Sequence, residues 1–417
     1  MMTSSTAAAR VNVVYAVAFI DMCAASTIVT LLPSFLKDDV GLSATAAGAV
    51  GSIYGVVQFL SSPLAGAAAD GLGFVDALVG CLLFSSLSYS LLPLNVPLLI
   101  CLSRALAGTF KHTQNLCKAF VGAALGEDDQ AKIATFGRLN SMGNAAFVVA
   151  PSLLGLVLPY GGSATVFLAC ASLFAFNSAI VYWCFPRDTV EIPQSPLSLV
   201  EGNSVFRRIF EPFTKIDWRL QWDVTAIRFL QSLLILLYRS TFNWAMADKF
   251  NASIGTVGLL TSFQGFVSFF ASYGAGYILA YGQLKKPTKA LVVMTAALAA
   301  SLLLMYWAVG DPLLYGVGLT GLCVTASLLR VVNLDVTVSR CAGGDQGVVV
   351  GVAASTVALA RAVAPALGGF VHERLGPDAP LLLALVLCLL SLHLAYAYTL
   401  PKQKRLAAQQ TSHKHRL

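Results

Sequence analysis

The stretch that decides the fold reads Arg104-Ala-Leu-Ala-Gly-Thr-Phe-Lys111-His-Thr-Gln-Asn-Leu-Cys-Lys118. It lies within a run of residues that is otherwise apolar enough to cross a bilayer. Its three cations recur about every two turns of an α-helix, so one continuous helix would present them on the same face. A charge that faces lipid costs about 3 kcal/mol or more. We therefore expect this face to point toward protein or water inside a bundle of membrane helices.

The composition of the whole chain supports a membrane protein. Of its 417 residues, 57% are hydrophobic and 11% are charged, whereas about 25% are charged in an average soluble domain. The mean hydropathy is +0.74, and apolar windows of about 20 residues recur along the sequence. The net charge of +7 falls mostly in polar segments between these windows, so membrane topology explains it better than nucleic-acid binding. We predict an all-α membrane protein with many spans.

The apolar windows predict twelve transmembrane helices in two groups of six. The expected spans are 12–35, 45–69, 74–93, 97–120, 133–158, 163–185, 223–246, 255–281, 288–309, 313–334, 348–371 and 379–400. This pattern predicts a cytosolic N-terminus over 1–11, a six-helix bundle over 12–186 and a polar cytosolic linker over 187–221. A second six-helix bundle over 222–400 and a basic cytosolic tail over 401–417 follow.

The positions of Lys and Arg predict the orientation of the chain. With both termini in the cytosol, the outer loops contain only Lys37, Lys249 and Arg374, while the inner segments contain many more basic residues. Such a bias is typical of cytosolic loops. We expect a multi-pass membrane protein with both termini cytosolic. The sequence leaves open whether it lies in the plasma membrane or an endomembrane.

The two halves of the sequence resemble each other. A shift of about 210 residues relates glycines and prolines of the first half to those of the second, as in transporters built from repeated halves around a midplane site. The aligned pairs are Gly48 with Gly258, Gly55 with Gly265, Pro151 with Pro365, and Gly155 with Gly369. The alternative is that some of the 34 glycines coincide by chance. We expect two pseudo-symmetric bundles.

The loop after the second predicted helix, Gly66-Ala-Ala-Ala-Asp70-Gly-Leu-Gly73, carries a family resemblance. Together with Arg104 and Gly108 of the fourth helix, it resembles the major facilitator superfamily, over essentially the whole chain. Within that family, the stretches from Gly51 and from Ala107 are similar to the tetracycline-resistance-like branch, including an animal orphan transporter. The resemblance implies the family's fold of twelve helices in two bundles and transport by alternating access.

Conformational motifs of the family match in part. The resemblance implies that Gly66, Asp70 and Gly73 help to latch the two halves on the cytosolic side, yet the basic residues usual after the aspartate are missing. Pro151 and Gly155 resemble the antiporter motif of the fifth helix. The mirror positions in the eleventh helix are Pro365 and Gly369.

Polar residues at membrane depth are the candidates for substrate binding and coupling. Asp21 and Lys111 lie at similar depths, so they can form an ion pair that a proton or an anionic substrate would break; a permanent structural salt bridge is the alternative. His112 could relay protons or be a hydrogen-bonded packing residue, and we expect the second. The other candidates for binding or coupling are Tyr54, Gln58, Arg104, Asn115, Gln231, Arg239 and Arg330. Their excess of cations favours an anionic or amphiphilic substrate, whereas arginines bonded to backbone carbonyls would be the structural explanation.

These observations predict a secondary active transporter of a small organic solute, open to proton coupling. The expected partners are the substrate, the lipid bilayer and protons, with no nucleic acid, and we expect a monomer. No Gly-x4-Gly-Lys-Ser/Thr loop or HExxH motif is present, so we expect neither an ATP-driven pump nor a hydrolase. We expect no metal and no cofactor. The alternative function is a ligand sensor or accessory protein with a transporter fold that does not transport.

Overall fold

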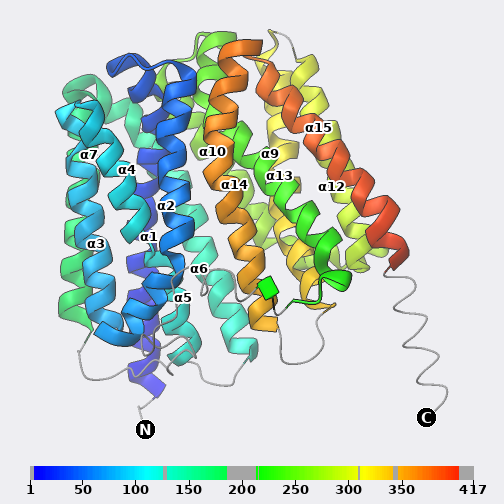
Figure 1. Ribbon diagram of the computed structural model, residues 1–417, viewed down its shortest axis with the longest axis horizontal. Coiled ribbons are helices and arrows are strands. Elements are labelled where there is room, and N and C mark those ends of the chain that lie inside the picture. Colours follow the sequence, from blue (N-terminus) through cyan, green and yellow to red (C-terminus); the bar gives the residue numbers. More distant parts are fainter. Residues whose placement is uncertain are drawn as a thin grey trace.

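All regular secondary structure in the described part of the chain is helical (Figure 1). The computed structural model describes residues 4–124, 129–185, 213–214, 216–308, 310–340 and 346–402. α1 begins and α15 ends toward the same, lower end of the molecule in Figure 1. We call this end the terminal end and the opposite one the far end.

The first half of the chain supplies seven helices and three short turns. They are α1 (Ser4–Ser34), the π-helical turn η1 (Phe35–Asp39), α2 (Ala44–Leu72), α3 (Phe74–Ser90), the 3-10 turn η2 (Leu92–Leu94), α4 (Pro97–Phe110), α5 (Thr113–Ala124), α6 (Asp129–Val149), the 3-10 turn η3 (Pro151–Leu153) and α7 (Leu154–Cys184).

The second half begins with α9, whose first residue lies within the segment expected to be linker. Its elements are α9 (Trp218–Phe250), α10 (Ile254–Tyr273), α11 (Ala275–Leu279), the 3-10 turn η4 (Gly282–Lys285), α12 (Pro287–Trp307), α13 (Pro312–Val338), α14 (Gln346–Leu375), α15 (Ala379–Leu394) and the π-helical turn η5 (Ala395–Thr399). The expected linker and tail lie mostly outside the described residues, so the domain boundaries stay predictions.

Ten stretches of the described chain are long and apolar enough to cross a membrane, and two local features reconcile them with the twelve expected spans. One stretch, Ser141–Cys184, has 44 residues, about twice the length needed for one crossing. Gly162 turns the chain inside it with a φ of 65°, so it holds the fifth and sixth spans. The fourth span is not among the ten stretches, because it is divided between two shorter helices, α4 and α5.

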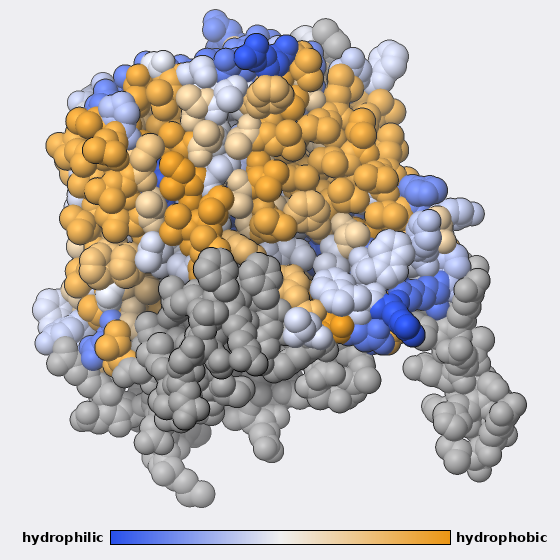
Figure 2. Space-filling model, in the orientation of Figure 1, coloured by the Kyte–Doolittle hydropathy of each residue, from blue (hydrophilic) through white to orange (hydrophobic). Residues whose placement is uncertain are grey.

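The surface of the molecule carries an apolar belt. Figure 2 shows this belt as a broad hydrophobic zone with hydrophilic residues above it. Tyr160 and Trp307 are 92% and 72% exposed near the far end, and Trp183 is 80% exposed near the terminal end. Exposed aromatic residues at both borders of an apolar belt are typical of the two membrane–water interfaces. The chain is a multi-pass membrane protein.

The bundles approach each other along two seams that use the related glycines. In the α2–α14 seam, a Cβ on Gly48 would lie 2.2 Å from the Pro365 carbonyl oxygen, and one on Gly369 would lie 2.1 Å from the Ala44 oxygen. Such distances are too short for any side chain. The backbones of α2 and α14, which lie side by side in Figure 1, are therefore in direct contact.

The second seam places α10 against α6, η3 and α7. A Cβ on Gly258 would lie 2.3 Å from the Pro151 carbonyl oxygen, and one on Gly265 would lie 2.8 Å from the Phe147 carbonyl carbon. Gly155 and Gly255 also meet here, backbone to backbone. Each seam thus joins a glycine of one repeat to a proline of the other, as pseudo-symmetric halves require.

Polar contacts close the far end between the bundles. Asn243 of α9 donates to the Thr30 oxygen, and Trp244 Nε1 donates to the Pro33 oxygen at 3.1 Å. The Glu373 carboxylate at the end of α14 accepts from the Thr45 amide at 2.8 Å. A carboxylate at a helix N-terminus is favourable because the free amides and the dipole there are positive. Among described residues, the polar contacts between the bundles lie at this end or midway along the helices, so the structure is closed at the far end.

Candidate functional site

The fourth span is broken in the middle, which corrects the expected single helix over 97–120. α4 ends at Phe110, and Lys111 leaves the helical region with φ −77° and ψ 66°. Two carbonyls that a continuous helix would pair with its own amides, those of Gly108 and Lys111, accept from α2 instead. Ser61 Oγ donates to the Gly108 oxygen at 2.9 Å, and Gln58 Nε2 donates to the Lys111 oxygen at 3.0 Å. The prediction of one continuous cationic face is therefore wrong.

Asp21 and Lys111 form the ion pair whose geometry the sequence suggested. The Lys111 ammonium donates to Asp21 Oδ1, and the two side chains are 8% and 1% exposed. The ammonium lies 4.4 Å from the centre of the Phe174 ring, a distance at which a cation is attracted to the ring face. Gln114 Nε2 approaches Asp21 Oδ2 at 3.4 Å. The pair thus lies within the core of the first bundle, whereas Asn115, one turn further, is exposed.

His112 is buried, with Nε2 at 2.8 Å from Ser61 Oγ, as expected for a packing histidine. Arg104 lies higher in the same bundle and is 5% exposed. Its guanidinium carbon is 4.9 Å from the Tyr54 ring centre and 6.0 Å from that of Tyr89. Its Nε and Nη1 atoms are buried without a hydrogen-bond partner in the described part of the chain. This cation lies against aromatic faces, and no acid of the described ranges pairs with it.

Gln58 connects the broken helix to the second bundle. Its amide nitrogen donates to Tyr54 Oη at 2.7 Å as well as to the Lys111 oxygen, and its amide oxygen accepts from Arg361 Nη1 of α14. Both the nitrogen and the oxygen of the Gln58 amide are therefore hydrogen-bonded at the midpoint of the α2–α14 seam. Gln58 was one of the candidates from the sequence analysis. Arg361 was not selected there, because nothing in its local spacing indicates a partner in the other half.

Arg239 and Arg330 form the most strongly cationic part of the structure between the bundles. Arg239 is exposed on α9, and its guanidinium carbon lies 5.7 Å from the centre of the Phe147 ring on α6. Arg330 of α13 is also exposed. Among described residues, neither arginine forms an ion pair with an acid. We call the solvent-accessible surface beside these two guanidinium groups the opening.

The remaining candidate residues have other positions. Gln231 is buried inside the second bundle, where it accepts from Asn333 at 2.7 Å and donates to Thr295 at 2.9 Å, so it does not line the opening. Gly73 precedes α3 with a φ of 87°, a conformation that favours glycine. The surroundings of Gly66 and the side chain of Asp70 lie outside the described residues. Pro151, Gly155, Pro365 and Gly369 all lie on the seams.

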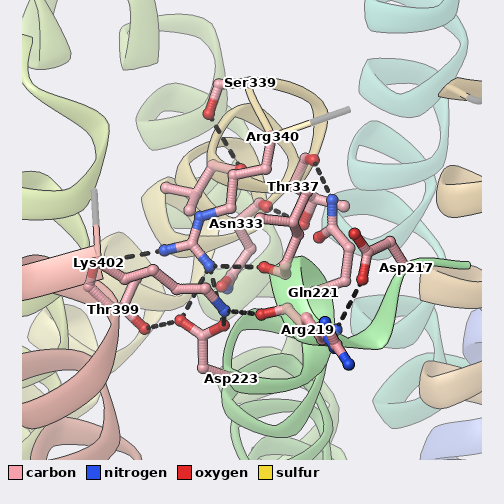
Figure 3. Close-up of polar contacts among 12 residues, drawn as sticks. Asp217, Arg219, Gln221, Asp223, Asn333, Thr337, Ser339, Arg340, Thr399 and Lys402 are labelled. Atoms are coloured by element: carbon pink, nitrogen blue, oxygen red, sulfur yellow. Dashed lines mark hydrogen bonds and ion pairs between the residues drawn. The ribbon is translucent and has the colours of Figure 1, made fainter. Parts of the chain in front are cut away.

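At the terminal end of the second bundle, a buried acid is bonded directly to basic side chains (Figure 3). Asp223 at the start of α9 accepts from Arg340 Nη1 at 2.8 and 2.9 Å, from Thr399 at 2.8 Å and from Lys402 at 3.1 Å. Asp223 and Arg340 have no exposed side-chain surface. This network joins α9, the end of α13 and η5, and its one carboxylate bonds both cations, so it is a structural link and not a binding site. The sequence analysis did not find it, because its members lie in three distant segments.

No cluster of three or more metal-ligating side chains occurs in the described ranges. The comparisons with known proteins bear on the whole chain. The model of the Major Facilitator Superfamily matches residues 14–238 and again 224–416. The chain belongs to this superfamily. The double match agrees with two homologous halves, and the expected fold of twelve helices in two pseudo-symmetric bundles is confirmed.

Relatives within the superfamily are transporters or carry its name. The chain is 27% identical over 346 residues to major facilitator superfamily domain-containing protein 10 of Bos taurus, covering 78% of this chain and 72% of that protein. It is 24% identical over 269 residues to the class C tetracycline resistance protein of Escherichia coli, covering 60% and 64%. The expected likeness to the tetracycline-resistance branch is thus confirmed.

Solved structures of the superfamily share the fold. The crystal structure of the human organic anion transporter MFSD10 (TETRAN) has a TM-score of 0.71 at 20% identity, covering 92% of this chain and 98% of that one. The nucleoside transporter NupG has a TM-score of 0.70 at 14% identity, covering 93% and 98%. At these identities the likeness shows the fold alone. Family and fold together indicate a membrane transporter and not an enzyme.

Proposed function

We propose that this superfamily member transports small organic anions by alternating access, with the anion bound between Arg239 and Arg330. The observation that carries the proposal is that both guanidinium groups are exposed and have no acidic partner among the described residues. An anion between them would gain charge-assisted hydrogen bonds. Uncompensated positive charge in a partly dry opening also raises the local concentration of anions.

The surroundings of the two arginines favour an organic anion over a small inorganic one. The Phe147 ring lies against Arg239, and Arg361 donates to Gln58 on the α2–α14 seam. Arg104 adds a buried cation beside Tyr54. A substrate with an apolar ring and one acidic group would use both kinds of contact. The structural neighbour described as a human organic anion transporter supports the same class of substrate.

The test uses two molecules of equal size that differ in charge, 2-naphthalenesulfonate and the neutral 2-naphthalenesulfonamide. The purified protein should bind the sulfonate more tightly, and proteoliposomes should take it up. Arg239→Gln and Arg330→Gln should weaken sulfonate binding and leave sulfonamide binding unchanged. Arg138→Gln, at an exposed position on α6, is the control. Equal binding of both molecules by the unmodified protein would contradict the proposal.

Proton coupling is the second part of the proposal, and Asp21 is the residue that would carry it. Protonation of Asp21 would free Lys111 and the helix break that Lys111 occupies. Asp21→Asn should then abolish uptake driven by a proton gradient and spare exchange of substrate. Because the pair is enclosed in the first bundle, a purely structural role predicts lower thermal stability with gradient-driven uptake retained. Unchanged driven uptake in the variant removes Asp21 from the mechanism.

The same proteoliposomes separate a transporter from a sensor with a transporter fold. A sensor would bind 2-naphthalenesulfonate with the same dependence on Arg239 but would not move it across the bilayer. Binding without any protein-dependent uptake, in vesicles of both orientations, would favour the sensor.

A further inference from the structure

The far end contains a buried histidine that the proposed transport mechanism does not use. His372 lies on α14, one turn beyond the contact of Gly369 with the α2 backbone, and it is 8% exposed. Its Nε2 atom lies 3.1 Å from Asp248 Oδ2 of α9. The centre of its ring lies 5.5 Å from that of Trp244, whose indole donates to the Pro33 oxygen of the first bundle. The imidazole is therefore enclosed within the polar closure between the bundles.

The Asp248 carboxylate connects this histidine to the first bundle. Asp248 Oδ1 lies 3.7 Å from the ammonium of Lys37 in η1, whereas Asp248 and His372 both belong to the second bundle. The contact between Asp248 and His372 can therefore persist when the far end opens. Lys37, in contrast, leaves the site together with the first bundle.

Other charged side chains at the far end are exposed or bonded to different groups. They are Asp38 and Asp39 of η1, Lys249 with its partner Asp378, and Glu373 and Arg374 of α14. Asp248 and Lys37 are therefore the described charges that act most directly on His372.

The neutral imidazole fits this site better than the protonated one. A carboxylate only accepts hydrogen bonds, so the contact with Asp248 assigns the proton of the neutral ring to Nε2 and leaves Nδ1 bare. Nδ1 is buried and has no hydrogen-bond partner in the described part of the chain. Protonation would place an N–H group there, and an unpaired buried donor is costly. It would also add a second positive charge beside Lys37.

We infer that His372 is a proton-binding site that controls the closure of the far end. When the bundles separate there, Lys37 moves away and water reaches Nδ1, while Asp248 stays beside the ring. The open state therefore binds the proton more tightly than the closed state, and acid shifts the population toward the open state. This inference depends neither on the substrate nor on Asp21, whose pair with Lys111 is enclosed in the first bundle.

The size of the effect follows from the ordinary pKa of histidine, which is about 6.5. If the open state alone binds the proton, the ratio of open to closed molecules at about pH 5.5 should be about tenfold higher than at about pH 8. Such a ratio corresponds to about 1.4 kcal/mol.

The experiment measures distances between spin labels at the far ends of the two bundles, in lipid nanodiscs at these two pH values. The labels replace Leu94 and Leu313, which are exposed at the far ends of the first and second bundles. They are attached to a ketone-bearing amino acid, so the native cysteines stay in place. No substrate is present, and the result is therefore independent of the proposed anion site.

Two histidine variants are compared with the unmodified protein. In His372→Gln, the amide can donate to Asp248 but cannot titrate. His393→Gln removes a histidine from the last turn of α15 and is the matched control. Acid should raise the ratio of open to closed molecules about tenfold in the unmodified protein and in His393→Gln, and the ratio should stay constant in His372→Gln.

A third variant tests the opposing charge. Lys37→Gln should be more open at alkaline pH, because the contact with Asp248 is lost. It should also respond less to acid, because the cation that opposes protonation of His372 is gone. The Lys37 side chain is 37% exposed, so this variant is expected to fold even if a change at the buried histidine prevents folding.

Three outcomes would overturn the inference. The first is an unmodified protein whose distances do not change with pH, and the second is an equal response in His372→Gln. The third is a response in Lys37→Gln as large as that of the unmodified protein. A response that persists in His372→Gln and disappears in Asp21→Asn would assign the proton-binding site to Asp21 instead.

Discussion

The two seams between the bundles have the same backbone arrangement and different chemistry. In both, a glycine meets the carbonyl of a proline in the other half, with Gly48 against Pro365 and Gly258 against Pro151. About two turns further, Gly55 meets Arg361, whereas Gly265 meets Phe147. The α2–α14 seam therefore contains a polar link through Gln58, and the α10 seam contains an aromatic ring beneath Arg239.

The two halves share the glycine contacts of the seams but differ in the side chains midway along them. Both seams need glycine because the helices touch through their backbones, and that need is the same in each half. The side chains midway along the seams differ between the halves, so an asymmetric substrate bound there would make different contacts with each half. The predictions below test the shared contacts first and then the differing ones.

The largest effect is expected from adding a methyl group to the shared contacts. In Gly48→Ala or Gly258→Ala, the new carbon would lie 2.2 or 2.3 Å from a proline carbonyl oxygen, so the helices must separate. Overpacking of this kind costs about 3 kcal/mol, enough to shift the balance away from the state closed at the far end by about a hundredfold. Distances between spin labels at the far ends of α2 and α14, and of α7 and α10, would measure the shift.

Gly351→Ala is the matched control, because nothing lies within 4 Å of the added carbon. If the seams are equivalent, the alanine variants at positions 48 and 258 should have similar effects. A change in only one of them would show that one seam alone keeps the far end closed.

The second prediction concerns the polar link of the α2–α14 seam. Gln58→Leu leaves the Lys111 carbonyl and the Arg361 guanidinium without a partner, and an unsatisfied buried polar group costs about 2 kcal/mol. Transport should fall, and the melting temperature of the detergent-solubilised protein should drop. Ser268→Ala, at the related position of the other half, should have a smaller effect on both. Equal losses in the two variants would show that Gln58 has no special role.

The third prediction concerns the cation of the α10 seam. Arg239→Gln should weaken binding of 2-naphthalenesulfonate about tenfold, which corresponds to about 1.4 kcal/mol, because one charge-assisted contact is lost. The thermal stability of this variant should not fall, since Arg239 is exposed and makes no ion pair with a described acid. Calorimetry would measure the affinity for the sulfonate, and thermal unfolding of the same preparation would measure the stability. A large loss of stability would mean that Arg239 has a structural role.

The smallest effect is expected at the ring of the α10 seam. Phe147→Leu keeps the apolar contact and removes the aromatic face beneath Arg239, a contact worth about 0.5–1 kcal/mol at an accessible site. Sulfonate affinity should change by about threefold at most. Titration of the variant against the unmodified protein would measure this change, and a loss as large as that of Arg239→Gln would mean that Phe147 itself contacts the anion.

Sequence analysis found features that depend on the nearby chain. It missed residues whose role depends on contacts with distant segments. The apolar windows gave the class of fold, because a chain in lipid must satisfy its backbone within helices. The repeated glycines and prolines indicated two related halves, and only the structure shows that they form both seams. The pairing of Asp21 with Lys111 was foreseeable from similar depth in a bilayer, although its enclosure in the first bundle was not. Arg361 and Phe147 were not selected, since only their neighbours from the other half make them part of the site.

The sequence by itself determined the number of spans, the two halves and the points of close backbone approach, because these depend on local hydrophobicity and on the size of single residues. The tertiary structure alone decided where the fourth span breaks and which cations are compensated. The break exists because Gln58 and Ser61, about fifty residues earlier in the chain, bond carbonyls that a helix would otherwise use itself. Whether an arginine has an acidic partner likewise depends on segments that only folding brings together.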